Sequence, residues 1–367
     1  MPAEWRTTSI GEVLTLQRGF DITRAQQGPG DIPVVSSGGI SSYHDTAATK
    51  GPGVVIGRKG TLGKTFYLIG DYWPHDTTLW VKEFKGNLPR FVYYFFTQLD
   101  VMGLDVGSAN PTLNRNHVHP IRVRWPSLSD QEGIAATLSA LDDKIALNEK
   151  IVRSCDELRS SRFTRHLAES AEFTQEESLS SVAGFVNGRA FTKGATGTGR
   201  MVVRIAEINS GPGASTVYND IEVPDQHLVH PGDILFAWSG SLSVTRWFRP
   251  EAIINQHIFK VLPRTGIPKW LAFELTKAKL DEFRMIAAGK ATTMGHIQRH
   301  HLDEPVVSPD DSDVARLDEE LGPLWDRALA AEQESLALVE LRDMLLPKLM
   351  SGELRVRDAE KVAEEVT

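Results

Sequence analysis

The sequence predicts an α+β protein that is a tandem duplication of one unit, a mixed α/β domain followed by a long helix. Two observations predict this fold. The first is a pair of long helical patterns, one over residues 129–167 and one over residues 312–346. The second is that the apolar positions of the two patterns correspond at one constant offset, as do segments upstream of each helix. Two copies at so long a period indicate a gene duplication rather than a solenoid.

The two helical patterns align residue by residue. Ile134 corresponds to Leu317, and the apolar residues step alternately by four and three, which is the spacing of a coiled-coil seam. Such a helix is roughly 50–60 Å long, so its narrow seam needs a partner helix. We therefore expect an antiparallel coiled coil with pseudo-two-fold symmetry, and we expect Gly322-Pro323 to bend the second helix or delay its start. The expected core of the helix pair is Leu138, Leu141, Ile145, Leu317, Leu321 and Leu324.

The repeat extends upstream into the globular parts. The aligned segments are residues 10–19 with 179–188, 52–62 with 231–242, and 113–123 with 297–307. Extra residues in the second copy lie mostly around the Gly-rich stretch 194–216. The strand candidates are residues 53–58, 77–82, 232–238 and 257–262, and the short-helix candidates are residues 89–99 and 268–283. The globular parts are thus predicted to be mixed α/β domains.

Length and composition are those of a globular protein with two or more domains. The chain has 367 residues, of which 41% are hydrophobic and 24% charged. Apolar runs such as residues 91–96 are too short to span a bilayer, and the N-terminus has no apolar segment after a basic start. One cysteine, Cys155, cannot form an internal disulfide. We therefore expect a cytoplasmic protein without a membrane partner.

Charge is unevenly distributed along the chain. A net charge of −8 and a pI of about 5.8 argue against a nucleic-acid binder, which is often basic. However, basic residues collect in residues 57–64, 115–124 and 296–301. A locally basic face on an acidic protein therefore remains compatible with the sequence.

The sequence does not indicate an enzyme. It contains no G-x-x-x-x-G-K-[ST] stretch, and the Gly-rich residues 194–200 do not lie between a clear strand and a helix, so they are expected to form a flexible loop. The histidines of residues 117–119 and 296–301 lack carboxylates or cysteines at metal-ligand spacing. We expect no catalytic residue, no metal site and no cofactor in this chain.

Three stretches carry a resemblance to a known family. They are "GVVIGRKGTLGKTFYLIGDYWPHDTTLWV" (53–81), "DQEGIAATLSALDDKIALNEKI" (130–151) and "LRDMLLPKLMSGELRV" (341–356). Together with the tandem repeat, they resemble the specificity subunit of type I restriction-modification enzymes, in the expected order and over nearly the whole chain. On this resemblance, Pro347 stops the second helix and Gly352 turns the chain into a strand-like tail.

The resemblance implies five segments. They are a first target-recognition domain (1–126), a first conserved spacer helix (127–170), a second target-recognition domain (171–308), a second spacer helix (309–352) and a C-terminal tail (353–367).

The resemblance also implies a non-catalytic DNA-binding function. Each target-recognition domain would read one half-site of a bipartite duplex DNA site, and the helical spacer would set the distance between half-sites. Because the two globular parts differ strongly in sequence, the site should be asymmetric. The helices would also dock modification (methyltransferase) subunits, which bring S-adenosylmethionine, and restriction subunits would add ATP-driven cleavage. The alternative is a structural or interaction protein with two protein-binding domains held apart by a helical spacer.

The best DNA-facing candidate is the loop "GRKGTLGK" (57–64). Its glycines allow close approach of the backbone, and Arg58, Lys59 and Lys64 can neutralise phosphates. The corresponding loop of the second copy has Trp238 and Ser239 in place of the basic pair. Two readers of different sequences need this combination of equal fold and unequal side chains, although a β-turn with surface lysines is the alternative.

Other polar residues at matching positions could contact DNA. Asp76 and Gln256 could read base edges or cap turns. Arg115 and Arg299 could contact phosphates or belong to a solvated loop before each long helix. The complete set of DNA-binding candidates is Arg58, Lys59, Thr61, Lys64, Asp76, Thr77, Asn114, Arg115, Trp238, Ser239, Ser241, Arg246, Asn255, Gln256, Lys290, Gln298 and Arg299.

Apolar residues off the helical seam are candidates for docking a modification subunit. These residues are Leu147, Ile151, Leu336 and Met344. The sequence does not identify the target bases, the spacer length, the stoichiometry of a complex or the presence of restriction subunits.

Overall fold

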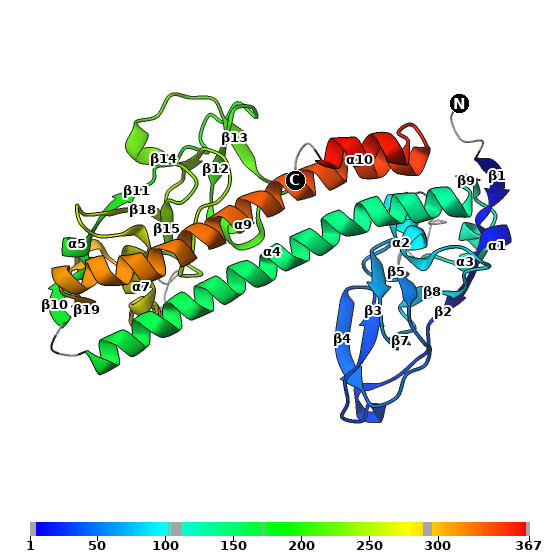
Figure 1. Ribbon diagram of the computed structural model, residues 1–367, viewed down its shortest axis with the longest axis horizontal. Coiled ribbons are helices and arrows are strands. Elements are labelled where there is room, and N and C mark those ends of the chain that lie inside the picture. Colours follow the sequence, from blue (N-terminus) through cyan, green and yellow to red (C-terminus); the bar gives the residue numbers. More distant parts are fainter. Residues whose placement is uncertain are drawn as a thin grey trace. The chain divides into compact units, whose positions relative to one another are not determined.

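The computed structural model describes residues 5–101, 103, 112–170, 172, 174–288 and 296–364, without the side chains of residues 360, 363 and 364. The chain divides into two compact units, drawn in Figure 1. Unit 1 contains residues 1–144 and 337–367, and unit 2 contains residues 145–336. Two long helices, α4 (Leu128–Glu169) and α9 (Asp311–Ser351), contribute to both units. The predicted α+β tandem fold is confirmed.

Unit 1 is built around a four-stranded antiparallel sheet. Its strands are β1 (Arg6–Ser9), β2 (Thr15–Arg18), β3 (Ile32–Ser36), β4 (Gly39–His44), β5 (Gly53–Gly57), β6 (Thr65–Leu68), β7 (Trp73–Pro74), β8 (Thr78–Glu83) and β9 (Arg122–Trp125). Its shorter helices are α1 (Ile10–Val13), η1 (Arg24–Gln26), α2 (Pro89–Gln98), α3 (Arg115–Val118) and α10 (Val356–Glu364). The main sheet has the order β2-β8-β5-β6, a second sheet has the order β4-β3-β7, and β1 pairs with β9.

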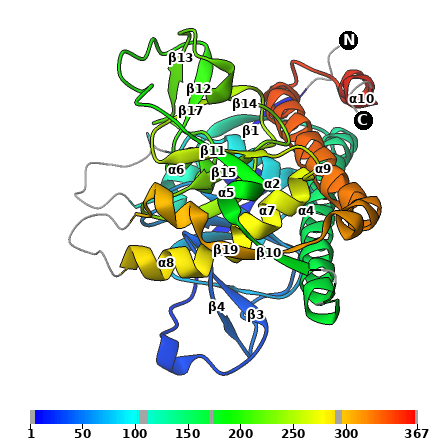
Figure 2. The same ribbon diagram turned by 90° about the vertical axis from the view of Figure 1, so that its left-hand side faces the viewer.

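Unit 2 repeats this plan. Its strands are β10 (Thr174–Ser178), β11 (Ala183–Asn187), β12 (Arg200–Val203), β13 (Val217–Asn219), β14 (Leu228–Val229), β15 (Ile234–Ala237), β16 (Ser243–Arg246), β17 (Ala252–Ile254), β18 (Ile258–Pro263) and β19 (Pro305–Pro309). Its shorter helices are α5 (Leu179–Val182), α6 (Ile205–Ser210), η4 (Asp225–His227), α7 (Lys269–Ala278), α8 (Leu280–Ala288) and η5 (Arg299–Asp303). The second sheet, which includes β13, β12 and β17, lies well away from α8 (Figure 2).

The two units share one topology. The main sheet of unit 2 has the order β11-β18-β15-β16, which matches β2-β8-β5-β6 strand for strand. Each second sheet contains one parallel pair, β3 with β7 and β12 with β17. Unit 2 adds β14 to this sheet, so part of its extra sequence forms additional structure. The duplication inferred from the sequence is therefore present in the strand pairing.

The hydrophobic core forms where the short helices cover the main sheets. All five residues of β5 and all four of β15 are buried, because each is an inner strand with both faces covered. In unit 1, Phe91 and Val92 of α2 are buried near β5 and β6. In unit 2, Trp270 and Leu271 of α7 belong to the main core cluster.

Helices α4 and α9 run antiparallel within each unit. In unit 2, Arg162 pairs with Glu320, and Asn148 donates to Glu334 at 2.8 Å. In unit 1, Arg342 donates to Asp142 at 3.1 Å. Of the six predicted core residues, Leu138, Leu141, Leu317 and Leu321 are buried, and Ile145 and Leu324 are half-buried.

Pro347 does not end α9, and Gly322-Pro323 does not delay its start, so these two expectations are wrong. The helix runs through Gly322-Pro323 and continues past Pro347 to Ser351. A proline inside a helix costs about 3 kcal/mol. Burial of Trp325 after the first proline, and of Leu349 after the second, opposes this cost. Gly352, with φ of +74°, follows the last helical residue, which is the usual place for a left-handed glycine.

The segment after Gly352 forms helix α10 rather than the expected strand-like tail. Val356 lies against Gly133 of α4, and Ala359 is fully buried. Val356, Ala359 and Val362 recur at helical spacing, so one face of the segment can pack within unit 1. The alternation seen over the first few residues was too short to specify a strand.

Candidate nucleic-acid interface

Four loops of unit 1 meet at one end of the main sheet. They contain residues 18–21, 58–64, 75–77 and 112–116, and we call them the four-loop surface of unit 1. Backbone hydrogen bonds join the loops. The Gly19 amide donates to the Thr78 carbonyl (3.0 Å), the Arg58 amide to the Thr77 carbonyl (2.9 Å) and the Leu113 amide to the Arg58 carbonyl (2.9 Å). These three bonds use backbone atoms only, so they hold the loops together whatever their side chains are.

Unit 2 has an equivalent four-loop surface, formed by residues 187–190, 238–242, 255–257 and 296–299. The Gly188 amide donates to the Ile258 carbonyl (2.9 Å), the Trp238 amide to the His257 carbonyl (3.1 Å) and the Ile297 amide to the Trp238 carbonyl (3.3 Å). These are the same three bonds as in unit 1. They make Arg58 equivalent to Trp238 and Asp76 equivalent to Gln256.

Glycines allow this close approach in both units. A Cβ atom on Gly19 would lie 2.1 Å from the carbonyl oxygen of His75, and a Cβ atom on Gly188 would lie 2.1 Å from that of Asn255. Gly60 and Gly240 have φ values of +78° and +67°, which other residues rarely adopt. The tight approach and the turn are thus built into both copies.

The four-loop surface of unit 1 contains a hollow of about 720 Å³ lined by cationic and polar side chains. Arg18, Arg58 and Arg115 contribute three guanidinium groups. Asp21 and Asp76 contribute carboxylates. The lining also includes Gln17, Gly19, Phe20, Leu79, Asn114 and Asn116. This mixture of donors and acceptors can bind phosphates and base edges.

An ion pair organises this hollow. Nη2 of Arg18 lies 2.6 Å from Oδ2 of Asp76, and the Arg18 side chain is 54% exposed. Burial alone would raise the pKa of Asp76. The hydrogen bond from Arg18 and the charges of His75, Arg18 and Lys59 outweigh burial and lower this pKa below its ordinary value. Asp76 is therefore an anion that holds Arg18 in place.

Arg58 is the more desolvated guanidinium of the hollow. Burial lowers its pKa, the positive charge of Arg18 lowers it further, and Asp76 opposes both effects. Arginine nevertheless stays protonated in proteins. Arg18 and Arg58 therefore place two positive charges side by side in a partly desolvated hollow, which favours a ligand with hydrogen-bond acceptors.

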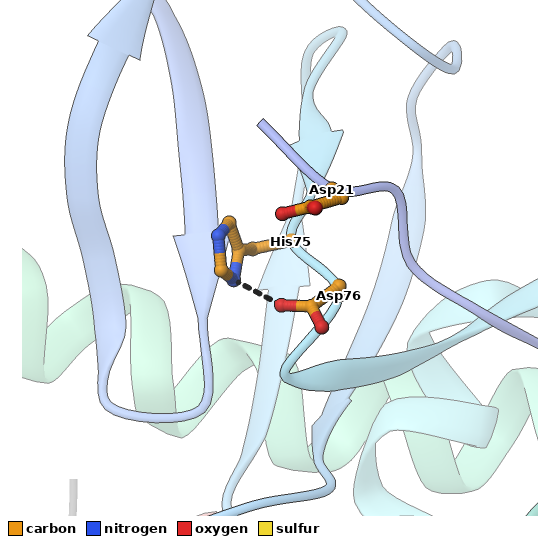
Figure 3. Close-up of side chains that lie close together, drawn as sticks. All are labelled: Asp21, His75 and Asp76. Atoms are coloured by element: carbon orange, nitrogen blue, oxygen red, sulfur yellow. Dashed lines mark ion pairs between the residues drawn. The ribbon is translucent and has the colours of Figure 1, made fainter. Parts of the chain in front are cut away.

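Asp21, His75 and Asp76 lie close together beside this ion pair (Figure 3). Their potential ligand atoms lie within 4.8 Å of one another, and Nδ1 of His75 is 3.1 Å from Oδ1 of Asp76. Arg18 binds the other oxygen of Asp76. Because Arg18 already neutralises Asp76, we assign Asp76 to positioning this arginine.

The remaining candidates of unit 1 lie around the hollow. Lys59 and Thr61 are exposed, as is Lys64, which donates to the Gly38 carbonyl at 3.2 Å. Thr77 is half-buried and bonds to His75. The structure thus places the loop "GRKGTLGK" beside Asp76, Asn114 and Arg115.

Three positions that are charged in unit 1, Arg18, Arg58 and Asp76, are held by neutral residues in unit 2. Nε1 of Trp238 donates to Oδ1 of Asn187 at 2.8 Å. The Trp238 ring lies 5.1 Å from the ring of His257. Ser241, Gln256, Gln298 and Arg299 are exposed. An indole and amides therefore occupy the positions that arginine and aspartate hold in unit 1.

Three candidates of unit 2 do not lie on the exposed surface. Ser239 and Asn255 are 4% and 6% exposed. Arg246, also buried, donates to Glu332 at 2.7 Å and stacks on Trp325 at 4.6 Å. We correct the assignment of Arg246, because the α9 carboxylate and the aromatic ring hold its guanidinium inside unit 2. Lys290 lies outside the described residues.

Arg18 and Asn187 also lie on the two surfaces, although they were not among the candidates predicted from the sequence. Each is the last residue of its strand, β2 or β11, and each precedes the close-approach glycine. The alignment of residues 10–19 with 179–188 already places Arg18 opposite Asn187. The signal in the sequence was that the two aligned segments carry different polar residues at this position, arginine in one and asparagine in the other.

The comparisons with known proteins agree with the fold. Residues 2–154 match the family model of the type I restriction modification DNA specificity domain. The crystal structure of the type I restriction-modification system S subunit from M. genitalium superposes with a TM-score of 0.68 at 15% identity, covering 95% of this chain and 96% of that chain. No curated protein matches the sequence.

Two further solved structures align over nearly the full length. One describes complex assembly of the type I R-M system (TM-score 0.40, 15% identity, 96% of this chain and 99% of that chain). The other is the HsdS subunit from Thermoanaerobacter tengcongensis (TM-score 0.35, 15% identity, 96% and 98%).

The fold and the two equivalent surfaces define a class of protein: a duplicated two-unit scaffold that presents different side chains on one backbone frame. Residues 2–154 are similar to the type I restriction modification DNA specificity domain, whose family model they match. The resemblance of the chain to type I specificity subunits is thereby confirmed. Among the described residues, no helix has both the length and the apolar character that a membrane span requires.

Proposed function

We propose that this chain is a non-catalytic DNA sequence-specificity subunit of a type I restriction-modification system. Each unit would read one half-site of a bipartite duplex DNA site. The observation that carries the proposal is the pair of four-loop surfaces, in which the same three backbone hydrogen bonds hold different side chains. The frame would set the approach to DNA, and the side chains would set the sequence.

The chemistry of the two surfaces suits duplex DNA. Arg58 and Arg115 in unit 1, and Arg299 in unit 2, would neutralise phosphates or reach base edges. Binding that depends on these few cations should weaken steeply with salt. Because Trp238 replaces Arg58 and Gln256 replaces Asp76, the two half-sites should differ.

The partners in this role are double-stranded DNA, modification subunits and restriction subunits. S-adenosylmethionine and ATP would be bound by those subunits. This chain would supply recognition and scaffolding in the cytoplasm, where its DNA target is located. The acidic net charge of −8 suggests weak DNA binding by the isolated chain, with modification subunits adding contacts.

We expect the modification subunit to dock on apolar residues of α4 in unit 2. Leu147 and Leu158 are 50% and 44% exposed. They are eleven residues apart, which is about three helical turns, so they share a face. The double variant Leu147→Asp/Leu158→Asp should lose co-purification with the modification subunit while remaining folded. Ile69→Asp, at a residue that is 82% exposed in unit 1, is the matched control. Unchanged co-purification of the double variant would refute this docking site.

The first test of the proposed function is long-read sequencing of modified adenine in the host genome, with and without the gene. A two-part motif with unread central bases that disappears on deletion would support the proposal and identify both half-sites. An unchanged pattern in a host that expresses the protein would favour the alternative, an interaction protein with two protein-binding units.

A further inference from the structure

One position of the four-loop surface carries a different side chain in each unit, and a residue at a non-equivalent position holds it in each case. Arg18 ends β2 and Asn187 ends β11, and both side chains are exposed. A side chain from another loop holds each one. Asp76 accepts a hydrogen bond from Arg18 at 2.6 Å, and Trp238 donates one to Asn187 at 2.8 Å.

On the basis of the proposed function, we infer that positions 18 and 187 determine specificity, Arg18 by reading guanine and Asn187 by reading adenine. In the major groove, guanine presents two acceptors, N7 and O6, which match the donors of a guanidinium. Adenine presents the N7 acceptor and the N6 donor, which match a carboxamide. Arg18 and Asn187 thus each carry the hydrogen-bonding groups that complement the edge of one purine.

Asp76 prepares Arg18 for this contact. Only Nη2 of Arg18 is bonded to Asp76, so other N–H groups of the fork can face a base. The ion pair restricts a long side chain before binding, which lowers the entropy lost on contact. Because Asp76 faces the same hollow as Arg58 and Arg115, its carboxylate also balances the cations there.

Trp238 prepares Asn187 in the same way. An indole Nε1–H can only donate, so it fixes which end of the Asn187 amide is oxygen. The amide oxygen retains a second lone pair, and the amide nitrogen retains two donors. One acceptor and one donor in a fixed orientation are what adenine requires.

A phosphate contact is the competing role for Arg18, and the surroundings disfavour it. Asp76 lies against the guanidinium, and Asp21 lines the same hollow. Two carboxylates would repel a phosphate that bound Arg18, whereas a neutral base edge meets no such repulsion. Lys64, whose Nζ donates to the Gly38 carbonyl rather than to a carboxylate, is better placed for a phosphate.

The test uses the chain assembled with the modification subunit of its host. Duplexes that carry the host motif with every half-site position randomised are methylated, and the modified molecules are sequenced. Arg18→Gln should reduce the preference for G·C at one position of one half-site by about 5- to 150-fold, and leave the other half-site unchanged. Asn187→Ser should reduce the preference for A·T at one position of the other half-site by a similar factor. Arg24→Gln is the matched control, since Arg24 is exposed in unit 1 and bonds only the Ser41 carbonyl among the described residues.

Three results would overturn the inference. Equal weakening at all sequences by Arg18→Gln would identify a phosphate contact. An altered position that is not G·C for Arg18, or not A·T for Asn187, would refute the assignment of the base. Unaltered preferences in both variants would exclude these positions from reading. The proposed function itself fails only if the wild-type complex selects no bipartite motif, so the two failures are distinguishable. Unchanged thermal midpoints confirm that the variants are folded.

Discussion

Unit 1 and unit 2 place opposite kinds of side chain on the same backbone. At the ends of β2 and β11, Arg18 is held by a carboxylate and Asn187 by an indole. The surrounding loops are joined by the same three backbone hydrogen bonds in each unit. Because these bonds use no side chain, the side chains can change without disturbing the loops. The comparison shows that the backbone hydrogen bonds that arrange the loops and the side chains that the loops expose can vary independently.

The long helices extend this comparison into the interior. Arg159 of α4 and Arg342 of α9 occupy equivalent positions of the repeat. Arg159 has no exposed side-chain surface and pairs with Asp156 and Glu274 inside unit 2. Arg342 is 28% exposed and pairs with Asp142 and Asp343 in unit 1. One duplicated arginine has therefore become a core residue in one unit and a surface residue in the other.

The largest expected effect comes from breaking the buried pair. Arg159→Leu should lower the free energy of unfolding of unit 2 by about 3–5 kcal/mol, because Glu274, only 4% exposed, would remain as an unpaired buried charge. Arg342→Leu should cost unit 1 about 1 kcal/mol or less, since its ion pairs are partly solvated. Hydrogen exchange with peptide resolution measures each unit separately.

The double variant Arg159→Leu/Glu274→Leu is the control for this prediction. It removes the stranded carboxylate and should restore part of the lost stability. If Arg159→Leu and Arg342→Leu cost the same, burial does not distinguish the two copies.

A smaller effect is expected from the glycines of the frame. Gly19→Ala and Gly188→Ala each place a Cβ atom 2.1 Å from a carbonyl oxygen, so the backbone must shift. Overpacking of this kind costs about 1–3 kcal/mol. Each variant should also reduce the base preference at the half-site read by its own unit, and leave the base preference at the other half-site unchanged. Thermal unfolding and the motif sequencing described above measure the two effects.

Gly38→Ala is the matched control, because a Cβ atom there meets nothing within 4 Å. It should leave stability and both half-sites unchanged. A loss of both half-sites in Gly19→Ala alone would contradict the independence of the two frames.

The sequence predicted the elements whose signals are local and repeated. The correspondence of Ile134 with Leu317 predicted paired long helices, and antiparallel contacts such as Arg162 with Glu320 are present. It failed where distant packing outweighs a local rule. Pro347 lacks an amide donor, yet burial of Leu345 and Leu349 on either side keeps the helix intact.

The sequence predicted which loops form the candidate site, but it did not predict which side chains of different loops contact each other. The loop with Arg58 and the turn with Asp76 were found because they repeat and are polar. Arg18 was missed because it ends a strand, and its importance depends on Asp76, which is far away in the sequence. Arg246 was included wrongly, since only the fold shows that β16 directs it toward α9. Pairing across loops is a tertiary property that composition and spacing do not contain.

The smallest expected effect concerns an acid-sensitive turn of unit 1. The Ser9 amide and the Thr8 hydroxyl donate to the Glu12 carboxylate at 2.8 and 2.6 Å. These bonds lower the pKa of Glu12 from an ordinary value of 4.5 to about 2. The repeat places Ser181 at the equivalent position of unit 2, where the Ser178 side chain accepts from the Ser181 amide. The two turns are thus capped by groups that respond differently to acid.

The sign of the pH dependence follows from the lowered pKa. The folded state binds fewer protons than the unfolded state, so the contribution of Glu12 is fully present above about pH 4.5 and is lost as the pH falls toward 2. The effect should be small because the Glu12 side chain is 62% exposed. Protection of the Ser9 amide from hydrogen exchange should decline over this range in the wild type. Glu12→Gln should remove the decline, because an amide cannot titrate. A Ser9 amide that keeps constant protection from pH 5 to about 3 in the wild type would show that the carboxylate does not cap this turn, and the two units would then be equivalent here as well.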